Sequence, residues 1–185
     1  MWIVLGVILV VIVLLVLFVI GIYNTLVRLR NQVDNSWSQI DVQLKRRHDL
    51  IPNLVETAKG YMKHERGTFE AITEARSKAM GAKNVSEASR AEGALGDALS
   101  KFMLVVENYP ELKANQNFLA VQEELSSTEN KIAFARQSYN DQVLGFNNKI
   151  QMFPSNIIAG MFSFIKRDFF EIENEAEREV PKVSF

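Results

Sequence analysis

The stretch FLAVQEELSSTENKIAFARQSYNDQVLGF, residues 118–146, decides the fold of this chain. Its apolar and small side chains recur alternately three and four residues apart, which places them in one stripe along a helix. The stripe consists of Phe118, Val121, Leu125, Thr128, Ile132, Ala135, Tyr139, Gln142 and Phe146. A strict alternation of this length is typical of coiled-coil packing, so we expect a long helix that buries the stripe against other helices.

Three shorter stripes with the same spacing precede this one. They are Val33, Trp37, Ile40 and Leu44; then Ile51, Leu54, Ala58, Tyr61, Phe69 and Ile72; and then Leu95, Leu99, Phe102 and Val106. The alternation typical of strands is not sustained anywhere. Four amphipathic helices predict an all-α fold, an antiparallel up-and-down four-helix bundle of coiled-coil type, over residues 24–165.

Three interruptions separate the predicted elements. The loop 81–86 contains Asn84, and Glu87 three residues later completes a capping box that opens the next helix. Pro110 and Pro154 end helices, because proline disfavours helical geometry in the residue before it. We expect no helix in the charged C-terminal tail, residues 166–185.

Pro52 allows two interpretations. Lys45, Arg46 and Arg47 suit a helix C-terminus and Asp49 suits the next N-cap, which would make the chain reverse at Pro52. However, the apolar residues on both sides of Pro52 stay in one helical phase, which a single kinked helix would also satisfy. We expect the reversal, because it gives segments of comparable length that can pack side by side.

The N-terminus carries an unbroken apolar run without charge, residues 2–22. At helical rise this run spans the roughly 30 Å hydrocarbon layer of a bilayer, so we expect residues 1–23 to form a single transmembrane anchor. No basic start and no small-residue cleavage site marks it as a cleaved signal. Arg28 and Arg30 follow the run and predict a cytoplasmic bundle with the N-terminus outside; both are candidate lipid headgroup contacts.

Composition excludes several classes of protein. Lys plus Arg number 21 against 22 for Asp plus Glu, so the net charge of −1 gives no reason to expect nucleic acid as a partner. The chain has no cysteine, which rules out disulfides, thiol catalysis and Cys-ligated zinc. The roughly 160 residues after the anchor suffice for one domain.

Several long segments resemble the LemA family. They are YNTLVRLRN (23–31), WSQIDVQLKRRHDLIPNLV (37–55), ENYPELKANQNF (107–118) and TENKIA (128–133), followed by Arg136, Tyr139-Asn140 and Phe153-Pro154 at the expected places. The resemblance implies a bacterial membrane protein with one N-terminal span and an up-and-down helical bundle. It implies no activity. One relative in that family is a membrane component of magnetosomes, which suggests by analogy a role in organising membranes.

The residues themselves argue against an enzyme. The two histidines, His48 and His64, each precede an acid, Asp49 and Glu65, and each pair could transfer protons or bind a metal. No second histidine stands four residues from either, no Gly-x-Ser-x-Gly turn is present, and no glycine-rich loop suits phosphate. We therefore expect no catalytic residue, no cofactor and no metal site.

Polar residues interrupt the apolar stripes. Arg47 and Glu65 fall among the apolar stripes in the first half of the predicted bundle. The long predicted helix carries Glu129, Asn130, Arg136 and Asn140. Buried polar groups cost free energy unless they are paired, so we expect them to hydrogen-bond across the bundle and fix its register. The alternative is a groove where they would bind a partner. Trp37 is expected in the core.

Two segments are candidate contact surfaces. Lys45, Arg46, Arg47, Asp49 and Pro52 form a predicted helix junction that either is simply solvated or docks a partner protein. The apolar C-terminal stretch carries Ile157, Ile158, Phe162, Phe164, Phe169 and Phe170. It is too short to span a membrane, and either completes the core or contacts the membrane or another subunit.

The first functional hypothesis is a non-enzymatic scaffold in the cell membrane that contacts lipids, forms homo-oligomers and organises the membrane or a membrane protein complex. The alternative is an adaptor that presents client or regulatory proteins to another membrane machine. A hydrolase or metal-dependent enzyme is a third class, which rests on His48, Asp49, His64 and Glu65 alone.

Overall fold

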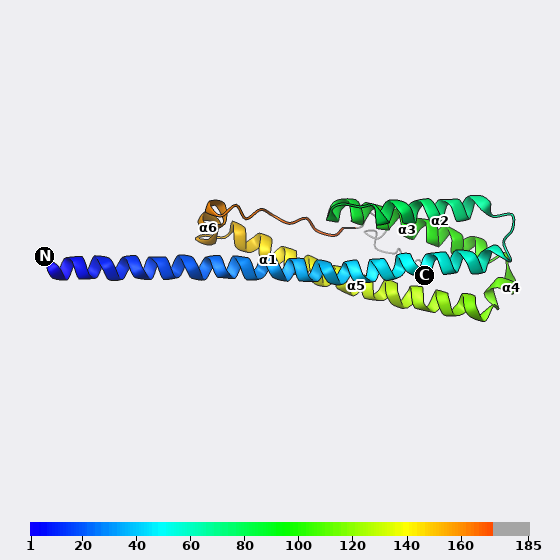
Figure 1. The fold of residues 1–185 in the computed structure, drawn as a ribbon, viewed down its shortest axis with the longest axis horizontal. Helices are drawn as coiled ribbons and strands as arrows, with labels where there is room; N and C mark the ends of the chain where they lie inside the picture. The colour runs from blue at the N-terminus through cyan, green and yellow to red at the C-terminus, as the bar shows by residue number, and fades with distance from the viewer. Residues whose placement is uncertain (172–185) are drawn as a thin grey trace, which may run out of the picture. The chain divides into compact units, whose positions relative to one another are not determined.

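A computed structural model describes residues 1–171 and shows an all-α protein, which confirms the predicted fold class. Six helices follow one another within this range (Figure 1). They are α1 (Trp2–Lys59), α2 (Arg66–Met80), α3 (Val85–Val106), α4 (Pro110–Lys113), α5 (Gln116–Gln151) and α6 (Ser155–Met161). No strand occurs among the described residues.

The chain divides into two compact units. The first, here called the anchor unit, contains residues 1–39 and 137–168; the second, the bundle unit, contains residues 40–136 and, of the described residues that follow, 169–171. The long helices α1 and α5 each run through both units. The predicted boundary between anchor and bundle, at residue 23, therefore falls inside an unbroken helix.

The bundle unit holds four helical segments that run up and down in turn: the end of α1, α2, α3 and the start of α5 (Figure 1). The predicted stripes supply its core. Its buried apolar residues include Ile51, Leu54, Ala58, Ile72, Leu95, Phe102, Val106 and Phe118. The ring of Phe102 lies between those of Phe69 and Phe118, at centroid distances of 6.2 and 6.4 Å, so α1, α2, α3 and α5 share one apolar interior.

The predicted reversal at Pro52 is wrong. α1 continues through Pro52 to Lys59, and the chain turns only between Gly60 and Glu65, before α2. Pro52 is exposed, while Ile51 and Leu54 are buried on the other side of the helix. The shared helical phase on both sides of the proline was thus the stronger signal, because it buries one continuous stripe.

A side chain on α2 compensates for the proline. Pro52 has no N–H, so the carbonyl of His48, four residues earlier, lacks its helical donor. Arg76 Nε donates a hydrogen bond to this carbonyl oxygen at 2.7 Å. The helix keeps its path because the acceptor that Pro52 leaves free is satisfied from the neighbouring helix.

The predicted capping box is confirmed. Asn84 is the N-cap of α3, and its side chain accepts a hydrogen bond from the Glu87 backbone N–H at 2.8 Å. The Glu87 carboxylate in return accepts from the backbone N–H of Lys83 at 2.9 Å, one residue before the Asn84 N–H that donates in a regular capping box. This bond lowers the pKa of Glu87.

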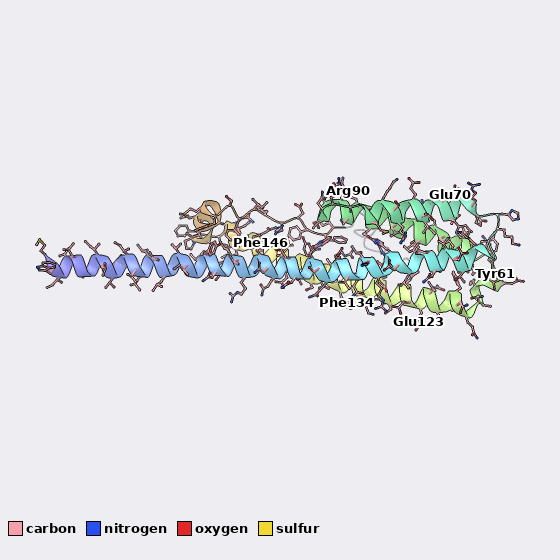
Figure 2. All side chains as sticks on the ribbon, in the orientation of Figure 1. Tyr61, Glu70, Arg90, Glu123, Phe134 and Phe146 are labelled. Atoms are coloured by element: carbon pink, nitrogen blue, oxygen red, sulfur yellow. The ribbon has the colours of Figure 1, made fainter. Side chains whose placement is uncertain are left out.

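The anchor unit contains the apolar run and the helix surface that follows it. The side chains of the run are exposed, and α1 is long and apolar enough to span a membrane (Figure 2). Past the run, Leu26 and Val33 on α1 and Phe146 on α5 are buried. Trp37, expected in the core, is half-buried and packs edge-on against Tyr139 with ring centroids 5.6 Å apart.

Hydrogen bonds hold the chain after α6 against the anchor unit. The Asn147 side chain donates to the backbone carbonyl of Arg167 and accepts from its N–H, both at 2.9 Å. Tyr139 Oη donates to the Asp168 carbonyl at 2.9 Å, and burial raises the pKa of Tyr139 to about 12, which keeps the phenol a donor. Of the predicted tail, 166–171 are described; 172–185 lie outside the described residues.

Candidate functional site

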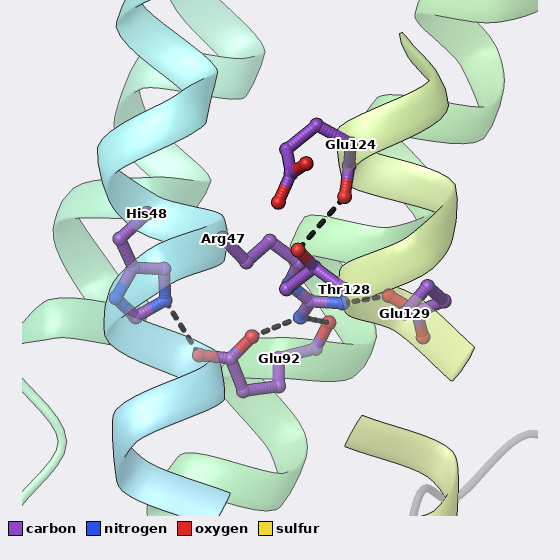
Figure 3. Close-up of polar contacts among 6 residues, drawn as sticks. All are labelled: Arg47, His48, Glu92, Glu124, Thr128 and Glu129. Carbon is purple, nitrogen blue, oxygen red and sulfur yellow. Dashed lines mark hydrogen bonds and ion pairs between the residues drawn. The ribbon is translucent and has the colours of Figure 1, made fainter. Parts of the chain in front are cut away.

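An ion-pair network that is buried except for Glu129 joins three helices of the bundle unit (Figure 3). The guanidinium of Arg47 on α1 forms an ion pair with the Glu92 carboxylate on α3, and its Nη1 lies 2.5 Å from Glu129 Oε2 on α5. His48 Nε2 lies 2.7 Å from the second oxygen of Glu92. The Glu92 carboxylate therefore contacts two consecutive residues of α1, Arg47 through one oxygen and His48 through the other.

Burial makes the pairing of this network necessary. Arg47 is 4% exposed and Glu92 3%, and an isolated charge at such a position would be very costly. Burial by itself would raise the pKa of Glu92, but the hydrogen bond from His48 and the charge of Arg47 outweigh it and lower the pKa. The network thus holds an ionised carboxylate inside the bundle and fixes the register of α1, α3 and α5.

A cavity of about 930 Å³ borders the network. Its walls come from α3 and α5 and combine small with apolar side chains, among them Gly93, Gly96, Leu99, Met103, Leu125 and Ser126. Arg47, Glu92 and Glu129 line its polar edge, and Arg47 Nε is buried without a hydrogen-bond partner among the described residues. Its volume is that of a small-molecule site, although its small-residue walls equally suit an inserted side chain.

The prediction that polar residues within the stripes pair across the bundle is confirmed for Arg47, but it did not name all of the residues that pair with it. Glu129 pairs with Arg47, and Glu65 accepts a hydrogen bond from Tyr109 Oη at 3.0 Å, whereas Asn130 is exposed. Sequence reasoning missed Glu92. The signal was present, because Glu92 continues the stripe of Leu95, Leu99, Phe102 and Val106 at the same spacing, and a charge inside an apolar stripe demands a partner.

The histidines do not form the pairs considered from the sequence. His48 contacts Glu92, while Asp49 is exposed, and His64 is exposed in the connection between α1 and α2. Residues 1–171 contain no group of three or more His, Cys, Asp or Glu that could hold a metal ion. The expected absence of catalysis, cofactor and metal stays a prediction.

The basic docking candidate lies on a continuous helix, not at a junction. Lys45, Arg46, Asp49 and Pro52 are exposed, and Arg46 Nη2 lies 2.5 Å from Glu124 Oε1 on α5. Arg47 is buried in the network and is not available to a partner at the surface. Docking at the four exposed residues stays a prediction.

The apolar C-terminal stretch is part core and part surface. Ile158 and Phe170 are buried, Phe164 and Phe169 are half-buried, and Ile157 and Phe162 are exposed. Of the two lipid candidates, Arg28 is exposed and Arg30 lies over the ring of Phe164, 5.4 Å from its centroid.

The fold and the network define a class: all-α proteins in which a terminal helix apolar enough to cross a membrane continues into a helical bundle fixed by buried ion pairs. The chain belongs to the LemA family, whose sequence model matches residues 36–185. This confirms the resemblance seen in the sequence.

Proteins of similar sequence agree with the assignment to the LemA family. Protein LemA of Metamycoplasma hominis is 29% identical over 161 residues, which cover 86% of this chain and 73% of that protein. Magnetosome protein MamQ 2 of Paramagnetospirillum magneticum is 24% identical and magnetosome protein MamQ of Magnetospirillum gryphiswaldense 22% identical. Each match covers 80% of this chain but only 64% of the magnetosome protein.

Proposed function

We propose that this protein is a non-enzymatic, membrane-anchored scaffold whose copies associate and organise the membrane or a membrane protein complex. The observation that supports it most is a strip of apolar side chains on the surface of the bundle unit, formed by Leu104, Leu119 and Phe134. Leu104 is 71% exposed and Phe134 74% (Figure 2). Leu104 lines one hollow with Gln122 and Ser126, and Leu119 and Phe134 line a second hollow with the same two residues, so the three apolar side chains lie around one polar surface of α3 and α5.

Membrane anchoring makes such a strip productive. Copies held in one bilayer meet at a high effective concentration, so contacts too weak to assemble a protein in solution can act there. Clustered exposed apolar side chains commonly mark interfaces between proteins. A second copy of this chain, anchored in the same membrane, presents its own strip at the same distance from the bilayer.

The names of two relatives are in keeping with this role, since both are called magnetosome proteins. This chain spans about two thirds of their length, so their assembly is proposed here by analogy only.

The absence of catalysis is part of the proposal. His48 and Glu92 are committed to each other and to Arg47 inside the bundle, as expected for a structural network. An adaptor is the second candidate, and the cavity between α3 and α5 favours it, because an apolar side chain of a client protein could enter it.

The test is the size of the full chain in a mild detergent, measured by light scattering. We expect a homogeneous homo-oligomer for the wild type and smaller species for the double variant Leu104→Ser with Phe134→Ser. Met80→Ser, an exposed apolar residue of α2 outside the strip, is the matched control and should leave the size unchanged. A wild-type monomer that co-purifies with one partner supports the adaptor, and a monomer alone overturns the scaffold.

A further inference from the structure

Helix α6 is apolar on both of its faces. Ser155, Ile158 and Ala159 are buried against the anchor unit, while Ile157 and Met161, one turn apart on the other face, are exposed. The flanking Phe153 and Ile165 are also exposed, and residues 152–165 carry no charged side chain. Exposed apolar side chains that cluster on a surface commonly mark a contact, so the side of α6 that carries Ile157 and Met161 is a candidate for one.

Contacts within the anchor unit fix where α6 lies along α1. The ring of Phe162, next to the last residue of α6, is 4.7 Å from the ring of Tyr23, and Phe164 is 5.9 Å from the same ring. Arg30, two turns further along α1, lies over Phe164. Figure 1 shows α6 beside the N-terminal half of α1.

This position coincides with the edge of a bilayer. Residues 2–22 rise by about 30 Å as a helix, which matches the hydrocarbon thickness. Tyr23, the first residue after the run, then lies at the membrane–water interface, where aromatic side chains concentrate. Phe162, the residue directly after α6, contacts Tyr23 and so brings the end of α6 close to this level.

We propose that α6 is a second membrane contact, an interfacial helix that places Ile157 and Met161 among the lipid chains. Phe153 precedes α6 and Ile165 follows it, and both are exposed; the next residue in the chain, Lys166, is also exposed and could meet the anionic headgroups that attract cations. Lipid fits better than a second copy because the face adjoins the transmembrane run. The inference rests on the membrane anchoring of the proposed function and not on self-association.

The absence of cysteine permits a direct depth measurement on the full chain. Single cysteines at four positions, Ile157→Cys, Met161→Cys, Leu14→Cys and Met80→Cys, carry a fluorophore in vesicles of phosphatidylcholine and phosphatidylglycerol with nitroxide-bearing acyl chains. We expect the labels at 157 and 161 to be quenched several-fold more than the label at 80, which lies on α2. Leu14 lies in the apolar run and reports anchoring itself.

The outcomes separate the possible failures. The interfacial helix is overturned if the label at 14 is quenched but the labels at 157 and 161 are quenched no more than the label at 80. The membrane anchoring is overturned if the label at 14 is not quenched. Labels at 157 and 161 that are shielded from water but not quenched by lipid identify a protein neighbour, which also overturns the inference.

A polar variant provides the second test. Ile157→Ser with Met161→Ser should remove most of the quenching of a label at Ile165→Cys, while circular dichroism stays helical. The oligomer size in detergent should not change, because the apolar strip on the bundle unit is intact. A label at 165 that is quenched as before overturns the role of this face, whereas a lost oligomer affects only the scaffold proposal.

Discussion

Arg76 is the residue that allows α1 to pass through Pro52. Its Nε donates to the His48 carbonyl that the proline leaves without a donor. Arg76→Leu leaves this partly buried acceptor unsatisfied, and we expect a loss of about 1 to 3 kcal/mol in the free energy of unfolding.

The double variant gives the specific check. Pro52→Ala restores an N–H that can bond to the His48 carbonyl, so the same Arg76→Leu change should cost clearly less in that background. Denaturant unfolding of all four proteins measures the coupling. Equal costs in both backgrounds would show that Arg76 acts through some other contact.

Glu92 should make the stability of the bundle depend on acid. Its pKa in the folded protein lies below the ordinary value of 4.5, so the unfolded chain takes up a proton more readily. The stabilisation is therefore complete above about pH 5 and is lost as pH falls through the folded-state pKa. Glu92→Gln should cost about 3 kcal/mol at neutral pH, because Arg47 loses its buried partner.

The comparison of wild type and variant across acid pH tests this assignment. Unfolding free energies measured from about pH 7 to about pH 3 should converge as the wild-type carboxylate is protonated. A constant difference over this range would mean that the ionised form of Glu92 contributes nothing.

At the level of helices, the stripes were predictable and the link between helices was not. The spacing of Phe118, Ile132 and Phe146 depends only on local helix geometry, and all three are buried as expected. The sequence left the path at Pro52 open between a reversal and a continuous helix, and the bond from Arg76 on α2 that supports the continuous helix comes only from the fold. The position of Arg47 could be predicted and its pairing with Glu92 could not, since tertiary packing of α1 on α3 decides it.

The stripe of α5 can be tested with a matched pair of residues. Ile132 is buried, whereas Phe134, two residues later on the same helix, is exposed. Ile132→Asp places an unpaired carboxylate in the core, and we expect a loss of about 4 kcal/mol or failure to fold. Phe134→Asp should change the free energy of unfolding by less than about 0.5 kcal/mol. A melting curve of Ile132→Asp equal to that of wild type would contradict the core assignment.

For the whole molecule, function depends on which side of the membrane the bundle unit occupies. Arg28 and Arg30 closely follow the apolar run. Because cytoplasmic flanks are enriched in Lys and Arg, we expect the bundle unit in the cytoplasm and the N-terminus outside.

Two measurements check this orientation. Protease added to spheroplasts should leave the bundle unit intact and digest it only after lysis, and a membrane-impermeant thiol reagent should fail to label Met80→Cys in intact cells. Arg28→Glu with Arg30→Glu weakens the charge bias and should let a fraction of the chains insert the other way. Labelling of Met80→Cys in intact cells with the wild-type arginines would reverse the topology, and the interfacial contact proposed for α6 would then be with the outer leaflet.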